Sequence, residues 1–138
     1  MYQFGKGVLK DDKQALKWYR KAAEQGYVFA QFNLGVMYDN GEGVLEDDKE
    51  AVKWYRKAAE QRYAKAQLKF GLMYAKGEGV LQDYVTAYAW ANISAANGSK
   101  TAPKFKSEVL EKIMTANQIA EGQKLSREMV KKNPKLLK

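Results

Sequence analysis

Three tryptophans, Trp18, Trp54 and Trp90, lie at intervals of 36 residues, and much of this chain of 138 residues follows the same interval. The segment 15–25 returns at 51–61 with a single substitution. A loop motif, Gly-x-Gly-Val-Leu-x-Asp, occurs three times at the same spacing, at 5–11, 41–47 and 77–83. Sequences that repeat with a period in the thirties form arrays whose units bury their apolar faces by stacking on one another. The sequence therefore predicts an extended stack, and the large surface of such a stack favours a binding protein.

Each unit contains the patterns of two helices. In the first helix, apolar or aromatic residues recur every fourth position on one face, as at Leu34 and Tyr38. In the second helix, an aspartate at the N-cap (Asp11, Asp47) precedes a glutamine or glutamate at the third helical position, as Asp47 precedes Glu50, which is the pattern of a capping box. The first helices are predicted at 28–39 and 64–75, and the second helices at 12–25, 48–61 and 84–97.

Glycines mark the turns and the closest contacts between helices. Gly41 follows a first helix and permits the turn into the second. Gly35 and Gly71 lie inside first helices, where glycine costs about 1 kcal/mol relative to alanine. We interpret this repeated cost as the close approach of a neighbouring helix, with the nearby tryptophan filling the space. The turn between units has glycine in two copies but Arg62 in the middle copy, so a left-handed backbone there would strain Arg62 by roughly 1 kcal/mol.

The third unit differs from the others on one face of its second helix. In the second unit this face carries Lys49, Lys53 and Lys57, and the first unit repeats the pattern. The corresponding residues of the third unit are apolar: Val85, Ala89 and Ile93. Because repeat arrays need a capping segment for solubility, we expect two C-terminal helices, at 103–114 and 116–132, to cover this face. An exposed patch for a partner is the alternative. The predicted contacts in the last helix are Ile119, Gln123, Ser126 and Val130.

The string from Ala30 to Ala59 reads Ala-Gln-x-x-Leu-Gly-x-Met-Tyr-x-x-Gly-x-Gly-Val-x-x-Asp-x-x-x-Ala-x-x-Trp-x-x-Lys-Ala-Ala. It resembles the Sel-1-like repeat family, short helical-pair relatives of the tetratricopeptide repeat. The resemblance implies an all-α, right-handed α/α superhelical solenoid of helix pairs with a C-terminal capping helix pair, whose first helices line a concave face. Members of the family are mostly adaptors and scaffolds, and many are bacterial. The segment 113–125 also resembles the closing segment of bacterial members.

We interpret the chain as one repeat domain that starts inside a repeat, because Met1 and Tyr2 align with Met37 and Tyr38 near the end of a first helix. A fragment of a longer protein is the favoured interpretation, and a natively incomplete first unit is the alternative. No signal peptide is visible, and the compartment, cytoplasmic or periplasmic, stays open. We expect a monomer, with self-association through the incomplete first repeat as the alternative. The predicted divisions are a partial first repeat at 1–26, repeats at 27–62 and 63–98, and a cap at 99–138.

Composition and motif spacing argue against several kinds of chemistry. The chain has no cysteine and no histidine, which removes disulfides, thiolate metal sites and the commonest general base. The Gly-x-Gly loops lack the further residues of a phosphate-binding loop, and the acidic run at 46–50 lacks EF-hand spacing. We therefore predict no catalytic residue, no metal ligand and no cofactor. No apolar run approaches the roughly 20 residues of a membrane span.

The formal net charge of +8 could attract nucleic acid. However, the lysines form stripes on outer helix faces, where they mainly serve solubility. Nucleic-acid binders usually interleave aromatic residues or arginines with the basic face. The repeated tryptophans, one in each unit beside paired alanines, fit a hydrophobic core better than a series for stacking on bases. We expect no nucleic-acid partner.

The candidate binding surface consists of first-helix positions that change between units while their neighbours persist. These positions recur at i, i+4, i+7 and i+11, which places them on one helical stripe. In the geometry that the resemblance implies, the stripe faces the concave groove. It is basic at one end and neutral at the other, which suits a peptide with an acidic segment; the alternative is that these are simply variable solvent-exposed positions. The predicted partner-binding residues are Phe29, Asn33, Val36, Asn40, Lys65, Lys69, Leu72 and Lys76.

The leading hypothesis is a non-catalytic interaction or scaffold module that binds a protein or peptide in the concave groove. One alternative is a hydrolase acting on cell-wall or β-lactam substrates, an activity proposed for some members of the family. Those members are rich in cysteine, which this chain lacks. A second alternative is a purely structural segment of a longer solenoid.

Overall fold

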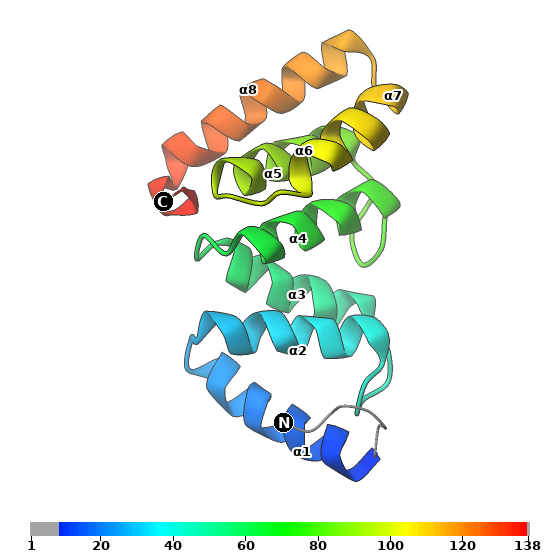
Figure 1. The fold of residues 1–138 in the computed structure, drawn as a ribbon, viewed down its shortest axis with the longest axis vertical. Coiled ribbons are helices and arrows are strands. Elements are labelled where there is room, and N and C mark those ends of the chain that lie inside the picture. Colours follow the sequence, from blue (N-terminus) through cyan, green and yellow to red (C-terminus); the bar gives the residue numbers. More distant parts are fainter. Residues whose placement is uncertain (1–8, 138) are drawn as a thin grey trace.

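The computed structural model describes residues 9–137, with side chains from residue 13 onward. Every regular element in this range is helical (Figure 1). The units contain α1 (Leu9–Glu24), α2 (Val28–Asn40), α3 (Asp48–Ala59), α4 (Ala64–Lys76) and α5 (Tyr84–Ala96). The C-terminal part contains α6 (Ala102–Phe105), the π-helical η1 (Lys106–Leu110), α7 (Glu111–Ile113), α8 (Ala116–Lys132) and a closing 3-10 turn, η2 (Pro134–Leu136).

The helices stack along the long axis of the molecule, from α1 at one end to α8 at the other (Figure 1). Each helix from α1 to α4 packs against the next one in sequence, and α5 packs against α8. The side chains of Leu34, Tyr55 and Phe70, from three successive helices, are almost completely buried in one continuous core. The predicted all-α solenoid of helix pairs is therefore confirmed.

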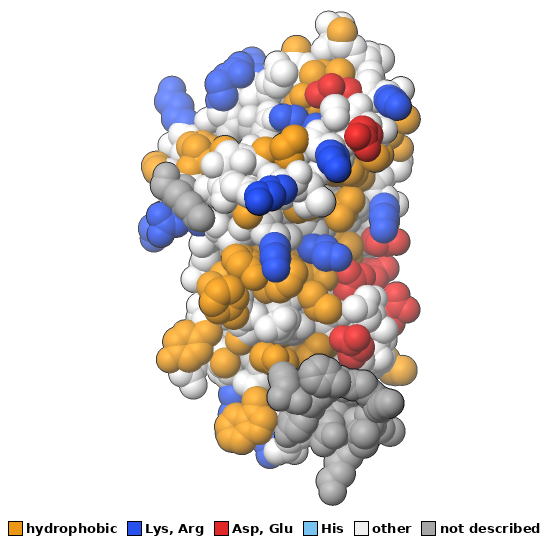
Figure 2. Space-filling view, in the orientation of Figure 1, with side chains coloured by type: hydrophobic (Ala, Val, Ile, Leu, Met, Phe, Trp, Pro, Cys, Tyr) orange, Lys and Arg blue, Asp and Glu red, His pale blue; other side chains and the backbone are white. Residues whose placement is uncertain are grey.

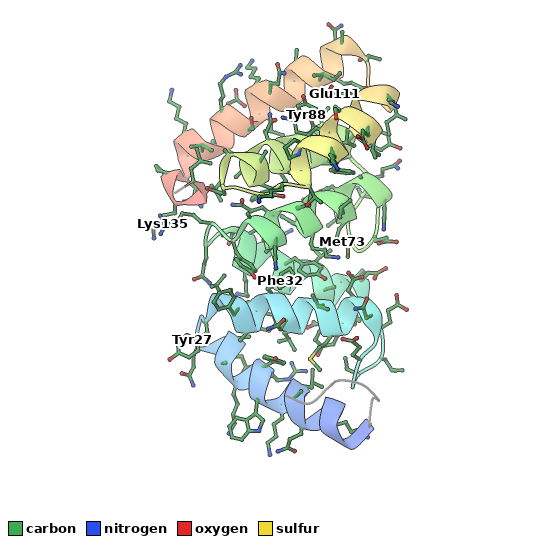
Figure 3. All side chains as sticks on the ribbon, viewed as in Figure 1. Tyr27, Phe32, Met73, Tyr88, Glu111 and Lys135 are labelled. Atoms are coloured by element: carbon green, nitrogen blue, oxygen red, sulfur yellow. The ribbon has the colours of Figure 1, made fainter. Side chains whose placement is uncertain are left out.

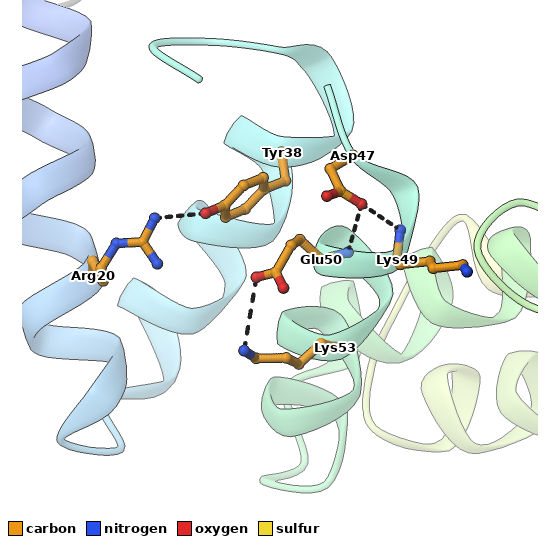
Figure 4. A network of polar contacts seen from close by, with 6 residues as sticks. All are labelled: Arg20, Tyr38, Asp47, Lys49, Glu50 and Lys53. Carbon is orange, nitrogen blue, oxygen red and sulfur yellow. Dashed lines mark hydrogen bonds and ion pairs between the residues drawn. The ribbon is translucent and has the colours of Figure 1, made fainter. Parts of the chain in front are cut away.

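Two of the second helices begin at the predicted N-cap aspartates. The Asp47 carboxylate accepts hydrogen bonds from two backbone N–H groups of the first turn of α3, at 3.1 and 3.2 Å (Figure 4). The Asp83 carboxylate caps α5 by accepting from the Thr86 N–H at 3.1 Å. The second hydrogen bond of the predicted capping box, from the Asp47 N–H to the Glu50 side chain, is not formed, so this part of the prediction is wrong. The Asp47 N–H donates to the Tyr38 carbonyl at 2.9 Å, and the Glu50 carboxylate pairs with Lys53 at 3.7 Å instead.

Helix α1 departs from the predicted boundary. It already includes Leu9, so it begins before the predicted start at residue 12. The predicted cap at Asp11 concerns a side chain outside the described ones. The first copy of the glycine loop and the alignment of Met1 with a helix end also lie outside the described residues.

Glycines occupy the positions where the backbone turns or where helices approach most closely. Gly41 ends α2 in the left-handed conformation, with φ of 72°. A Cβ at Gly35 would lie 2.7 Å from Cδ1 of Tyr55, and one at Gly71 would lie 3.1 Å from the Ala87 carbonyl oxygen. The predicted close approach of the neighbouring helices, α3 and α5, is confirmed. At Gly35 the space is filled by a tyrosine ring and not, as predicted, by a tryptophan.

The turn between α3 and α4 forces Arg62 into the left-handed region, with φ of 70°. Its repeat equivalents, Gly26 and Gly98, have φ of 95° and 102°. We predict that Arg62→Gly raises the free energy of unfolding by about 0.5–1 kcal/mol, because glycine relieves a strain of about 1–2 kcal/mol but gains more freedom in the unfolded chain. Urea denaturation of the two proteins measures the difference. A variant less stable than the parent would contradict this account of the turn.

Two of the three repeated tryptophans lie in the core, and the third does not. Trp54 and Trp90 are 4% and 7% exposed, whereas Trp18 is 60% exposed, so the prediction of a core position was wrong for Trp18. Trp90 of α5 packs against Phe70 of α4, with ring centroids 5.1 Å apart. Within the described residues α1 has no first helix of its own unit, so the Trp18 ring has no such partner and stays open to solvent.

Helix α8 covers the apolar face of α5, as predicted. Ala89 and Ile93 are 0% and 2% exposed, and α8 lies alongside α5 (Figure 1). The two helices are close enough that a Cβ at Gly122 would lie 2.8 Å from Cδ1 of Tyr88. The Tyr88 hydroxyl donates to the Glu111 carboxylate at 2.7 Å, which ties α5 to α7 (Figure 3).

The predicted contact residues of α8 are confirmed, although one of them is exposed. Ser126 is buried, and Ile119 and Val130 are half-buried against the two core clusters. Gln123 is exposed, but its side chain forms a hydrogen bond with the Tyr88 hydroxyl of α5, so it also takes part in the contact. The buried position belongs to its neighbour Gly122, because the Tyr88 ring leaves no room for a side chain at that point of the helix.

Candidate functional site

The face of the stack formed by the first helices contains a hollow of about 520 Å³, which we call the groove. Figure 2 shows this face: hydrophobic side chains gather over α2 and α4, and acidic side chains lie along the edge formed by the α2–α3 and α4–α5 loops. The groove is lined by Phe32 from α2, by Lys65, Leu68, Lys69 and Leu72 from α4, and by Ser99, Thr101, Lys104, Phe105, Glu108 and Val109 from the segment after α5.

An aromatic cluster holds the α2 wall of the groove. The Phe32 ring lies 5.1 Å from the Tyr63 ring and 5.8 Å from the Tyr55 ring, measured between centroids. Phe29 packs edge-on against the same Tyr63 at 5.3 Å, and it is itself 64% exposed. Figure 3 shows Phe32 between α2 and α4, with Tyr27 at the outer edge of the same face. Since Phe32 is fixed on two sides, this wall is formed before any ligand arrives.

The rim of the groove is basic. Lys65 and Lys69 are exposed on successive turns of α4, and Lys104 faces the groove from α6. Among the described side chains, one ion pair is present, and it joins Lys53 to Glu50. No described carboxylate therefore lies within ion-pair distance of the three ammonium groups of the rim. Glu108 is the one acidic side chain of the lining. The groove therefore combines an apolar interior with an unneutralised positive rim.

The structure brings together three of the eight predicted site residues. Lys65, Lys69 and Leu72 line the groove. Five others do not line it, although they lie on the same two helices: Phe29, Asn33, Val36, Asn40 and Lys76. Phe29 borders it through the shared Tyr63 contact.

Sequence reasoning missed several groove residues for two separate reasons. Phe32 and Leu68 are repeat equivalents that differ between units, so the comparison of first helices contained the signal that would have identified them. Lys104, Phe105 and Val109 had no such signal. They belong to the segment after the third unit, which has no repeat equivalent and which the sequence pattern assigns entirely to a cap.

Two buried tyrosines have pKa values raised above the usual range, and both serve as hydrogen-bond donors. Burial, followed by the Asp39 carboxylate, raises the pKa of Tyr55, whose hydroxyl donates to Asp39 at 3.0 Å. Burial, followed by the bond to Glu111, raises the pKa of Tyr88 to about 12. Both hydroxyls stay protonated at neutral pH, and they join α3 to α2 and α5 to α7.

The acidic side chains of the described structure form no metal site. Among the described side chains, from residue 13 to 137, no group of three or more acidic residues is placed to hold a metal ion. The acidic run at 46–50 instead supplies the N-cap of α3. No helix of the described range is both long and apolar enough to cross a membrane.

Comparison with known families gives one match that repeats along the chain. Three consecutive segments, at 1–27, 28–63 and 64–99, match the family described as Sel1 repeat. Together they span residues 1–99 of the 138. No curated protein matches the chain.

Two solved structures are similar in both sequence and fold. One is c5321, a protective antigen present in uropathogenic Escherichia coli strains that displays an SLR fold; it is 38% identical, with a TM-score of 0.86 over 94% of this chain. The other is a Sel1 repeat protein from Oxalobacter formigenes, also 38% identical, with a TM-score of 0.66 over 85% of this chain. The matched regions are 28% and 50% of those two chains, so this chain spans only part of their length.

Proposed function

The chain belongs to the Sel1 repeat family, and we propose that it is a non-catalytic interaction module that binds a peptide segment of a partner protein in the groove. Proteins of this family are generally protein-interaction scaffolds. The observation that supports the groove as the site is its combination of an apolar interior with three lysines that have no carboxylate partner among the described side chains.

The size and shape of the groove favour a segment of polypeptide. Its volume of about 520 Å³ lies within the range of about 300–1,000 Å³ that is typical of ligand sites. Its walls come from three separate parts of the chain, α2, α4 and the α6–η1 segment, so an elongated ligand can contact all of them at once. Phe32, Leu68 and Leu72 offer an apolar surface for one or two large side chains. The stripe residues outside the groove, Asn33 among them, would extend the contact along α2.

The charge of the rim selects an acidic partner. A carboxylate that reaches Lys65 or Lys69 gains a charge-assisted hydrogen bond, which contributes about 1.5–3 kcal/mol. Because no carboxylate of the described chain already occupies these lysines, the partner does not have to displace one. The favoured ligand is therefore a segment in which large apolar residues alternate with aspartate or glutamate.

A displayed library of random peptides tests the proposal even while the natural partner is unidentified. Selection against the immobilised chain should enrich sequences that combine leucine, isoleucine or an aromatic residue with two or more acidic residues. The enriched peptides should lose binding to Lys65→Glu/Lys69→Glu. Absence of enrichment, or enrichment of peptides that bind this variant equally well, would contradict the proposal.

We predict that Lys65→Glu/Lys69→Glu weakens binding of a selected peptide by roughly 10- to 100-fold, the equivalent of about one lost charge-assisted hydrogen bond. The matched control is Lys13→Glu/Lys17→Glu on exposed positions of α1. Each double substitution changes the formal net charge from +8 to +4, since each lysine-to-glutamate change removes two units. Long-range attraction therefore falls equally in both, and only contact in the groove separates them. Isothermal titration calorimetry with the same peptide provides the comparison, and equal losses would indicate diffuse electrostatics.

A further inference from the structure

A second hollow, of about 480 Å³, lies on another part of the molecule, between the end of α1, the start of α2 and α3. It shares no lining residue with the groove. Its lining includes Ala23, Glu24, Gln31, Lys53, Trp54 and Lys57. Unlike the groove, its surface is mostly polar.

The hollow is lined by two buried side chains, Trp54 and Gln31, whose hydrogen-bond donors are not all satisfied. Trp54 is 4% exposed, and its indole Nε1–H is buried without a hydrogen-bond partner. Gln31 is also 4% exposed, and its Nε2 donates to the Ala23 carbonyl at 3.2 Å. A side-chain amide carries two donor hydrogens, and Gln31 Nε2 has no second acceptor among the described residues. A buried donor without an acceptor costs about 1–3 kcal/mol, so an incoming acceptor would be favoured at this position.

The repeat equivalent of this site is occupied by the chain itself. Gln67 and Asn97 correspond to Gln31 and Gln61, 36 residues further along. The Leu136 carbonyl accepts hydrogen bonds from Gln67 Nε2 at 3.0 Å and from Asn97 Nδ2 at 2.7 Å. Leu136 belongs to η2 and is 3% exposed. In this copy of the site, a backbone carbonyl of the C-terminal segment thus accepts the hydrogen bonds.

The two copies of the site differ in charge. Beside the segment that contains Leu136, the third unit has Ala89 and Ile93; the second unit has Lys53 and Lys57 at the equivalent positions. The ammonium groups of these lysines lie 5.0 and 5.9 Å from the centre of the Trp54 ring. Lys53 is paired with Glu50, while no carboxylate lies within ion-pair distance of Lys57 in the described chain. The open copy therefore lacks the apolar surface that receives Leu136 and offers cationic donors in its place.

We propose that the hollow beside Trp54 is a second recognition site, which binds a short extended acidic segment of a partner protein. A backbone carbonyl of the segment accepts from Gln31 Nε2, as the Leu136 carbonyl does from Gln67. The carboxylate of a neighbouring aspartate or glutamate accepts from Lys57 and from the Trp54 indole N–H. Glu24, which also lines the hollow, offsets the charge of one lysine, so the selectivity depends on the hydrogen-bond donors of Gln31 and Trp54.

Nuclear magnetic resonance of the Trp54 indole group tests this site in the full chain. The probes are acetyl-Ala-Leu-Asp-Ala-amide and the same peptide with asparagine in place of aspartate. The aspartate peptide should move the Trp54 indole proton signal downfield in a saturable way, and the asparagine peptide should bind about tenfold more weakly. The signal is assigned by its absence from Trp54→Phe.

Two matched variants separate local contact from general charge. Lys53→Gln/Lys57→Gln should weaken the aspartate peptide about tenfold, whereas Lys17→Gln/Lys21→Gln, the same stripe one repeat earlier, should not. Each changes the formal net charge from +8 to +6. The proposal is overturned if the Trp54 signal does not respond up to the solubility limit of the peptide, if both peptides or both variants behave alike, or if acetate alone gives the same saturable shift. Lys65→Glu/Lys69→Glu should weaken this response no more than Lys13→Glu/Lys17→Glu, which has the same net charge, so failure here and failure of the groove are distinguishable.

Discussion

Replacing Trp54 with alanine lowers the free energy of unfolding by about 3–5 kcal/mol, as expected for truncation of a large core side chain. Trp54 is 4% exposed and belongs to the continuous core that includes Leu34 and Ala58. Removal of the indole ring leaves a cavity that the neighbouring helices, fixed by close contacts such as that between Gly35 and Tyr55, cannot fill. Urea denaturation followed by circular dichroism measures the loss.

Trp18→Ala is the matched control, because Trp18 has the same sequence neighbours as Trp54 but is 60% exposed. We expect it to lower the free energy of unfolding by less than about 1 kcal/mol, as surface substitutions usually do. Equal losses at the two positions would show that the repeat, and not burial, determines the contribution of the tryptophan. A negligible loss at Trp54 would indicate an exposed ligand-binding residue and would contradict the core assignment.

Deletion of residues 116–138 removes α8 and η2 and should cause both destabilisation and self-association. The deletion exposes Ala89 and Ile93, which are otherwise almost completely buried, and it removes the hydrogen bonds from Gln67 and Asn97 to the Leu136 carbonyl. We expect the free energy of unfolding to fall by about 3 kcal/mol or more, since large core losses fall in this range. Sedimentation velocity should show concentration-dependent oligomers, because the uncovered face of α5 is apolar.

Gly122→Val tests the same contact in the full-length chain. Its Cβ would lie 2.8 Å from the Tyr88 ring, so the valine pushes α8 away from α5. Glu121→Val on the exposed side of α8 is the control for the change in side-chain type. A truncated chain that stays monomeric and melts at the original temperature, or equal stability of the two valine variants, would contradict the capping role of α8.

Much of the fold could be predicted because each local signal occurs more than once. Asp47 and Asp83 begin α3 and α5 as predicted, since a carboxylate at the N-cap satisfies N–H groups that no helix can satisfy by itself. The strain at Arg62 followed from the glycines at its repeat equivalents. The cover over α5 followed from the loss of its lysine stripe, because an apolar helix face in water is unfavourable.

The predictions that failed have two physical causes. Repeat equivalence assumes that each unit has the same neighbours, and this assumption fails at the ends of an array. Trp18 has the sequence of a core residue, but within the described residues no first helix packs on it as α4 packs on Trp90, and it is exposed. The reciprocal bond expected at Glu50 failed because the Asp47 N–H already donates to the Tyr38 carbonyl, a contact between helices that helix-local rules do not include.

The candidate site was predicted only in part, because one of its walls lies outside the repeats. Lys65, Lys69 and Leu72 lie on a repeated helix, and comparison of units identified them. The opposite wall, which includes Phe105 and Val109, belongs to a segment without a repeat equivalent. Its position against α4 depends on packing after α5, where the chain passes through the π-helical segment η1, and no sequence period indicates that path.

The central claim is that a partner peptide binds in the groove, and chemical-shift mapping of side-chain methyl groups tests it most directly. A peptide obtained by selection against the chain is titrated into the isotope-labelled protein. We expect the largest shifts at the methyl groups of Leu68, Leu72 and Val109, which line the groove. Leu45 and Leu81, which are 88% and 90% exposed on the loop edge, should not respond. Shifts at Leu45 and Leu81 with none at Leu68, Leu72 and Val109 would contradict the claim.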